Sequence, residues 1–133
     1  MICYLVFLFG LIGIASSANA SGLNMDIEEK IVYFAEKQGV DPQLALAIAQ
    51  CESGLTPSAK NRHSSASGVF QFIKGTWKDT TKRLGWHGEV DVFDGHLNVI
   101  AGIYVLREDG TRPWESSRSC WEPKLSANLS AVL

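Results

Sequence analysis

One carboxylate in this sequence has unusual neighbours, because Glu52 follows a stretch, residues 43–51, that carries no charge. Residues 44–49 are all apolar, and a helix that is apolar nearly all round is a buried one. Burial disfavours the charged form of a carboxyl group, so we expect the pKa of Glu52 to be raised. A raised pKa is what a general acid needs near neutral pH. The competing interpretation is a solvated glutamate at the end of a helix.

A second carboxylate is missing from the stretch after Glu52, because the next acidic residue is Asp79. Glycoside cleavage normally uses two carboxylates, an acid and a nucleophile or base. Asp79, Asp91 and Asp94 remain possible partners from elsewhere in the chain. An enzyme with one carboxylate can also work, provided that the substrate brings its own nucleophile.

Capping signals predict the helices that must position Glu52. Asp41 followed by Pro42 is a strong start signal for the helix that carries it, and Gly54 stops that helix. The helix before it starts after Asn24 or Asp26 and stops at Gly39. Further helices are expected at about 76–84 and, after an Asp94 cap, at about 95–108. Residues 55–72 read as a long ordered loop, and residues 123–133 as a tail that frays. The predicted fold class is mostly α: a compact helical domain with an open substrate cleft.

The N-terminal segment predicts export. Residues 2–15 are an apolar run, and Ala18-Asn19-Ala20 resembles a signal-peptide cleavage site. We therefore expect a signal peptide over residues 1–20, one domain over residues 21–133, and a periplasmic or extracellular protein. The apolar run is short for a membrane span, and no later segment resembles one.

Cysteine content agrees with export. Cys3 lies in the expected signal peptide, which leaves Cys51 and Cys120 in the mature chain. Two cysteines in a small exported domain most economically form one disulfide. Such a bridge would tie the helix of Glu52 to the C-terminal segment. Two separate free thiols are the alternative.

Charge and histidine content argue against several partners. The chain has 12 basic and 14 acidic residues and a formal charge of −2, which gives no reason to expect nucleic acid as a partner. The spacings of the three histidines match no usual metal-ligand pattern, so we expect no metal site. A locally basic flank could meet an anionic polymer, or could be a solvated face. The residues of this basic flank are Lys60, Arg62, Lys74, Lys78, Lys82 and Arg83.

Three ordered motifs carry a resemblance to a known family. They are Glu52-Ser53, the Gly-x-x-Gln of residues 68–71, and the Asn-x-x-x-Gly-x-Tyr of residues 98–104. In this order and at these separations they resemble the catalytic domain of the soluble lytic transglycosylases, which has a lysozyme-like fold. Val69 and Phe70 depart from the commoner Leu-Met of the second motif. The resemblance covers the chain from about residue 27 to residue 104.

The resemblance implies roles for individual residues. It makes Glu52 the single acid and base, and Ser53 the serine of the Glu-Ser pair. It places Gln71 in the sugar cleft and Asn98 and Tyr104 facing the glutamate or the substrate. Phe70 is a candidate substrate contact, and Phe72, Trp77 and Trp86 could stack on sugars or pack in the core.

The implied substrate is the glycan strand of peptidoglycan. The 6-hydroxyl of N-acetylmuramic acid can serve as the nucleophile, so the product would carry a 1,6-anhydro ring. That reaction requires no metal or organic cofactor, and we expect a monomer. One alternative is a muramidase that uses water, with Asp91 or Asp94 as the second carboxylate. Another is a glycan-binding module without turnover.

Overall fold

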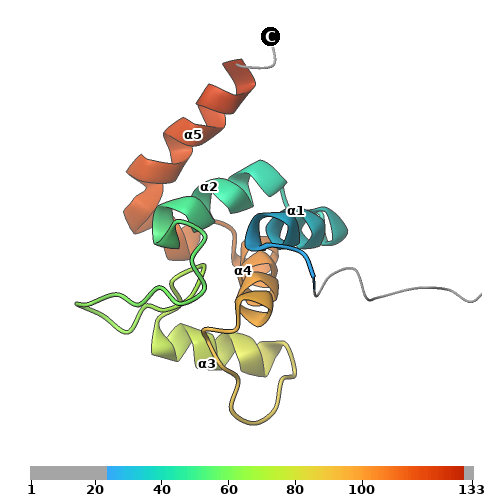
Figure 1. Ribbon diagram of the computed structural model, residues 1–133, viewed down its shortest axis with the longest axis vertical. Coiled ribbons are helices and arrows are strands. Elements are labelled where there is room, and N and C mark those ends of the chain that lie inside the picture. The colour runs from blue at the N-terminus through green and yellow to red at the C-terminus, as the bar shows by residue number, and fades with distance from the viewer. Residues whose placement is uncertain (1–23, 131–133) are drawn as a thin grey trace, which may run out of the picture.

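The computed structural model describes residues 24–130, and their side chains up to residue 126. The expected signal peptide therefore lies outside the described residues. Within them the chain is helical, with two isolated β-bridges and no strand, as the sequence predicts. The elements in Figure 1 are α1 (Ile27–Gln38), α2 (Pro42–Ser53), α3 (Lys74–Arg83), α4 (Gly95–Asp109), the 3-10 helix η2 (Arg112–Ser117) and α5 (Arg118–Ser130).

The capping signals that predict three of these helices are confirmed. Asp26 starts α1 with a capping box, in which its side chain accepts a hydrogen bond from the backbone N–H of Glu29 and the Glu29 side chain accepts one from the backbone N–H of Asp26. Asp41 and Asp94 likewise cap α2 and α4 through their side chains. These caps satisfy N–H groups that a helix leaves without partners at its first turn.

The core forms where the helices meet around α4. Helix α1 packs against both α2 and α4, α5 packs against α2, and α3 packs against α4 (Figure 1). Four of the apolar residues of α2 are buried as predicted, with Ala45, Ile48 and Ala49 fully inaccessible to solvent, whereas Leu44 and Leu46 are partly buried. Small alanine side chains let neighbouring helices approach the end of α2 closely, which fixes the backbone that carries Glu52.

Two predicted boundaries are wrong. Helix α3 begins at Lys74 instead of about Thr76. The extended residue Ile73 offers no side-chain cap, and the N–H of Lys74 donates instead to Ser65 Oγ, nine residues away, so no local signal marks the start. The tail expected to fray after Pro123 is instead part of α5, which continues to Ser130. The reason lies upstream, because the buried side chain of Trp121 anchors the first turns of α5. Residues 131–133 lie outside the described part.

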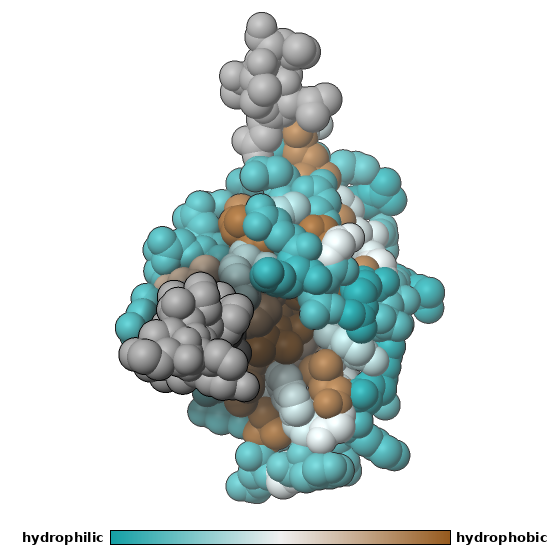
Figure 2. All heavy atoms as spheres, turned by 90° about the vertical axis from the view of Figure 1, so that its right-hand side faces the viewer, coloured by the Kyte–Doolittle hydropathy of each residue, from teal (hydrophilic) through white to brown (hydrophobic). Residues whose placement is uncertain are grey.

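The surface agrees with one small core. In Figure 2, hydrophilic side chains form most of the visible rim, and apolar side chains are recessed in a hollow between them. Of the large apolar residues in the described part, Tyr33, Ile73 and Phe93 are exposed. None of the helices over residues 24–130 combines the length and the apolar character that crossing a membrane would need.

Candidate active site

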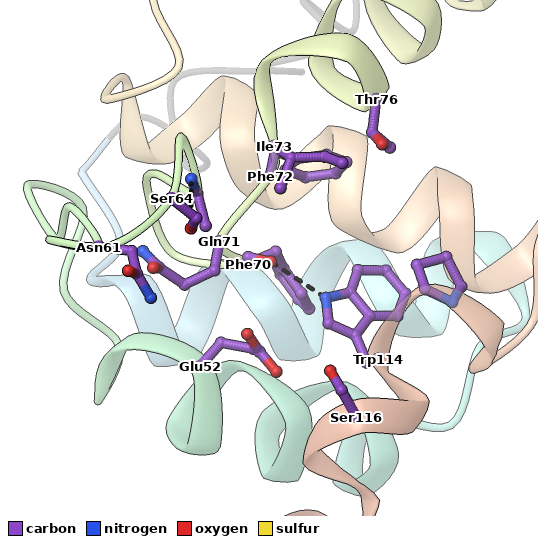
Figure 3. Close-up of a pocket in the computed structure, with 12 residues that line it drawn as sticks. Glu52, Asn61, Ser64, Phe70, Gln71, Phe72, Ile73, Thr76, Trp114 and Ser116 are labelled. Atoms are coloured by element: carbon purple, nitrogen blue, oxygen red, sulfur yellow. Dashed lines mark hydrogen bonds between the residues drawn. The ribbon is translucent and has the colours of Figure 1, made fainter.

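Glu52 lies in the last turn of α2 and faces a cleft of about 440 Å³ (Figure 3). This volume falls within the range of small-molecule sites. The cleft is walled by the loop before α3 on one side and by η2 on the other. Its lining residues are Glu52, Asn61, Ser64, Ala66, Phe70, Gln71, Phe72, Ile73, Thr76, Pro113, Trp114 and Ser116.

The environment of Glu52 raises the pKa of its carboxyl group, as the sequence predicts. The main cause is burial, because Glu52 is only partly exposed to water. The Ser117 hydroxyl donates a hydrogen bond to Glu52 Oε1 at 2.5 Å and lowers the pKa, but by less than burial raises it. The carboxyl group is thus more readily protonated than an exposed glutamate, which suits a general acid.

No second carboxylate lines the cleft within the described residues. Asp94 instead caps α4, and Asp91 accepts a hydrogen bond from the backbone N–H of Phe93 at 2.9 Å. Asp91 lies in a separate pocket with Trp77 and Val90. Both aspartates thus serve local backbone structure away from Glu52.

Ser53 joins α2 to the loop. Its Oγ lies 2.7 Å from the carbonyl of Val69 and 3.3 Å from that of Ala49, and it accepts a hydrogen bond from the N–H of Thr56. The structure does not place Ser53 among the cleft-lining residues. Its position supports a role in fixing the loop relative to Glu52.

Asn98 is fully buried and makes a similar connection from α4. Its Oδ1 accepts a hydrogen bond from Phe70 N at 2.9 Å, and its Nδ2 donates to the carbonyl of Val92 at 2.8 Å. Close packing requires the neighbouring glycine, because a Cβ on Gly68 would lie 2.1 Å from Asn98 Nδ2. Asn98 therefore fixes the backbone of the loop that lines the cleft, and its side chain is not among the lining residues.

Phe70 lines the cleft but its side chain is fully buried. The ring rests on α4 at Gly102, where an added Cβ would lie 2.3 Å from a ring carbon. Phe72 and Trp77 are also buried, and their ring centroids are 5.3 Å apart. These aromatic residues pack in the core, one of the two roles expected for them.

Gln71 lies in the cleft with its backbone in a left-handed conformation, φ 51°. This region is unfavourable for a residue with a Cβ, and such outliers cluster at functional sites. Its Nε2 donates to the carbonyls of Ala59 and Gly68, at 3.2 and 2.9 Å. Both amide hydrogens are thereby used, so Oε1 is the group that Gln71 can offer to a ligand.

Tyr104 occupies a different place from the one expected. The guanidinium groups of Arg83 and Arg107 lie over its ring, at 5.2 and 5.3 Å from the ring centroid. It lines a separate pocket together with Phe34 and Gln38. The structure does not bring Tyr104 to the cleft of Glu52, so its position gives no support to a contact with the substrate.

The sequence predicts that the C-terminal segment is tied to the helix of Glu52, but not that η2 forms a wall of the cleft. The indole of Trp114 is buried and its Nε1 donates to the carbonyl of Phe70 at 3.0 Å, shown dashed in Figure 3. Pro113 and Ser116 flank it in the cleft, and Ser117 contacts Glu52 directly. One signal could have revealed them: a bridge from Cys51, next to Glu52, brings the residues just before Cys120 to the same place.

That bridge is present. Cys51 and Cys120 form a disulfide with their Cα atoms 6.0 Å apart, as the sequence predicts. It covalently joins the end of α2 to α5, directly beside Glu52. Of the residues in the basic flank, Lys60, Arg62 and Lys74 are exposed next to cleft-lining positions. The described residues contain no cluster of His, Cys, Asp or Glu that could hold a metal ion.

A comparison with known families gives a match over most of the chain. The model of the transglycosylase SLT domain matches residues 29–120, which is more than half of the chain. The match starts in α1 and ends at the second cysteine of the disulfide, so it includes Glu52, both walls of the cleft and α4. It agrees with the lysozyme-like helical fold described above.

Proposed function

Because this chain belongs to the transglycosylase SLT domain family, a family of glycan-cleaving domains, we propose that it is a lytic transglycosylase of peptidoglycan. In this proposal it cleaves the β-1,4 bond between N-acetylmuramic acid and N-acetylglucosamine and forms 1,6-anhydro-N-acetylmuramic acid. The observation that carries the proposal is that Glu52 is the one carboxylate lining the cleft in the described part of the chain. Its raised pKa fits the starting state of an acid.

In the first step, protonated Glu52 gives its proton to the bridging oxygen. The bond from C1 to that oxygen breaks, and the electron pair leaves with the oxygen. In the second step, the 6-hydroxyl oxygen of the same muramic acid attacks C1, and the Glu52 carboxylate takes its proton. The carboxyl group returns to its starting state. The two steps therefore balance without a water molecule and without a second carboxylate.

A water-using muramidase is the second candidate, and it would need a carboxylate opposite Glu52. Asp91 and Asp94 were the best candidates from sequence. Each is engaged with backbone N–H groups, and neither lines the cleft. These positions favour the one-carboxylate reaction. A binding module without turnover is the third candidate, and the raised pKa of Glu52 argues for retained chemistry.

Export remains part of the proposal. Peptidoglycan lies outside the cytoplasm, and the disulfide between Cys51 and Cys120 suits an oxidising compartment. We therefore propose a periplasmic or extracellular protein that acts as a monomer, with residues 21–133 as its single catalytic domain.

The deciding experiment identifies the products. Purified peptidoglycan is incubated with residues 21–133, and the released muropeptides are analysed by mass spectrometry. We expect anhydro products, with a loss of about 100- to 10,000-fold in Glu52→Gln, because a general acid typically contributes that much. The matched control is Glu36→Gln, an exposed glutamate of α1, which should keep full activity.

Other outcomes select the other candidates. Reducing-end products, together with a large loss of activity in Asp91→Asn or Asp94→Asn, would make the protein a hydrolase. Glycan binding without any product would leave a binding module. An unchanged rate in Glu52→Gln would reject Glu52 as the acid.

A further inference from the structure

The hydroxyl of Ser117 lies within hydrogen-bond distance of two acceptors. One is Glu52 Oε1 at 2.5 Å, and the other is the carbonyl oxygen of Trp114 at 3.0 Å. A serine hydroxyl has one hydrogen and can donate it to one acceptor at a time. Ser117 therefore has two hydrogen-bonding states, and its choice depends on which oxygen attracts the proton more strongly.

The carbonyl of Trp114 tolerates either choice. It also accepts a hydrogen bond from the indole Nε1 of Trp121 at 3.0 Å, and this interaction is buried. When Ser117 turns towards Glu52, the carbonyl keeps the Trp121 bond and is not left unsatisfied. Turning the hydroxyl thus does not leave a buried polar group without a partner.

The charge on Glu52 decides the balance. A peptide carbonyl is a better acceptor than the oxygen of a neutral carboxyl group, whereas a hydrogen bond to a carboxylate is roughly twice as strong as one between neutral groups. Ionisation of Glu52 therefore draws the Ser117 proton fully to Oε1. The hydrogen bond strengthens as negative charge develops on the acid, which is the condition under which an interaction speeds a reaction.

We propose that Ser117 is the positioning residue of Glu52: it binds Oε1 as the carboxylate forms and leaves Oε2 to exchange the proton with the substrate. This inference rests on the proposed function, in which Glu52 first gives a proton and then takes one back. Within the described residues, Oε1 is the Glu52 oxygen that a protein hydrogen bond fixes. The orientation of the carboxyl group then follows from a single contact.

The surroundings keep Ser117 in place. The disulfide joins Cys51, the residue before Glu52, to Cys120, three residues after Ser117. On the other side of Ser117, the indole of Trp114 is bound to the carbonyl of Phe70. The segment is therefore fixed on both sides of Ser117. The disulfide ties one side to the end of α2, and the buried hydrogen bond ties the other side to the loop that lines the cleft.

No charged group competes with Ser117 for Glu52 among the described residues. The other side chains that line the cleft, from the loop and from η2, carry no ionisable group. Glu115 on η2 and Arg118 on α5 are exposed and pair with each other, with N and O 3.4 Å apart. Cys51 does not titrate, because it is in the disulfide. The pKa of Glu52 thus has two opposing causes, burial and Ser117.

The first test measures the pKa of Glu52 without substrate, by carbon-13 NMR of the glutamate carboxyl groups. Glu52→Gln identifies the signal. In Ser117→Ala the midpoint should move to higher pH, because the variant loses the donor that favours the carboxylate. Ser117→Thr keeps a hydroxyl and should stay near the wild-type midpoint. Ser119→Ala, an exposed serine of the same segment, should leave the midpoint unchanged.

The second test measures the release of anhydro products against pH for the same proteins. We expect kcat/KM of Ser117→Ala to fall about 10- to 100-fold, somewhat below the loss that follows removal of an oxyanion-hole donor. The alkaline limb of the profile should move to higher pH, because activity needs protonated Glu52 in the free enzyme. Ser117→Thr should restore both the rate and the limb, whereas Ser117→Val, which has the same shape without the hydroxyl, should not.

The outcomes separate this inference from the proposed function. A midpoint that stays at the wild-type value in both Ser117→Ala and Ser117→Val overturns the role of Ser117, whatever happens to the rate. A different result rejects the proposed function: the midpoint rises in Ser117→Ala, but the wild type releases no product. The hydrogen bond from Ser117 to Glu52 would then still stand. Should Ser117→Ala fail to fold, Ser117→Thr and Ser117→Val give the same comparison between a side chain with and a side chain without the hydroxyl.

Discussion

The two walls of the cleft both face Glu52, but they use their polar side chains in opposite ways. The backbone of the motif wall, residues 68–72, is held by side chains of two helices: Ser53 donates a hydrogen bond to the carbonyl of Val69, and Asn98 accepts one from the N–H of Phe70. In the tail wall, residues 113–117, the hydroxyl of Ser117 reaches the carboxylate. One wall is held by its polar groups, whereas the other presents a polar group to the acid.

This difference shows that the residues that can be recognised in the sequence are not the ones that contact Glu52. The residues that stand out in the sequence are those whose types and spacing the backbone geometry demands, such as a glycine at φ 81° beside a buried asparagine. Contact with the acid needs only a hydroxyl in the right place, and any chain segment can supply one. We therefore expect motif-wall variants to act mainly through stability and tail-wall variants mainly through the acid.

The largest effect on stability should come from removing the disulfide that ties the segment of the tail wall to α2. The variant Cys51→Ala with Cys120→Ala removes a bridge between residues 69 apart in sequence. Loss of such a constraint on the unfolded chain should cost about 4 kcal/mol. Urea denaturation of the oxidised wild type and the variant measures it, and reduced wild type should match the variant. An unchanged midpoint would mean that noncovalent packing of the tail wall is sufficient.

The next effect tests the motif wall alone. Asn98→Ala removes the partners of two backbone groups, the N–H of Phe70 and the carbonyl of Val92. We expect a loss of roughly 2–4 kcal/mol, because unsatisfied buried groups carry their full desolvation cost. Thermal unfolding measures this loss, and product release is compared at a temperature where both proteins are folded. A stable variant without turnover would instead place Asn98 in contact with the substrate, and the contrast between the walls would fail.

How far the sequence predicts the fold depends on how local each signal is. The caps Asp26, Asp41 and Asp94 each act within one turn, and all three are found where expected. Helix α5 escaped prediction because its support is distant. Pro123 argues locally against a helix, but the disulfide of Cys120 anchors the segment to Cys51, 69 residues away in sequence.

The site follows the same rule. Burial of Glu52 could be predicted because the apolar run that causes it is adjacent in sequence. The positions of Tyr104 and Ser117 could not, because each depends on how distant elements pack. Arg83 on α3 lies over the ring of Tyr104 on α4, and both line a pocket separate from the cleft. The Ser117 hydroxyl reaches Glu52 across a sequence separation of 65 residues.

The smallest effect on stability, and the sharpest test of the contrast, concerns Gln71. Replacement by glycine relieves a left-handed backbone that costs a residue with a Cβ about 1–2 kcal/mol, and loses two hydrogen bonds of about 1 kcal/mol each. Because these contributions nearly cancel, the unfolding midpoint should move little. If Oε1 accepts a hydrogen bond from a sugar, the KM for glycan strands should rise several-fold in Gln71→Gly while kcat changes less. An unchanged KM would make Gln71 a loop support like Ser53 and Asn98, and the motif wall would then act entirely as a scaffold.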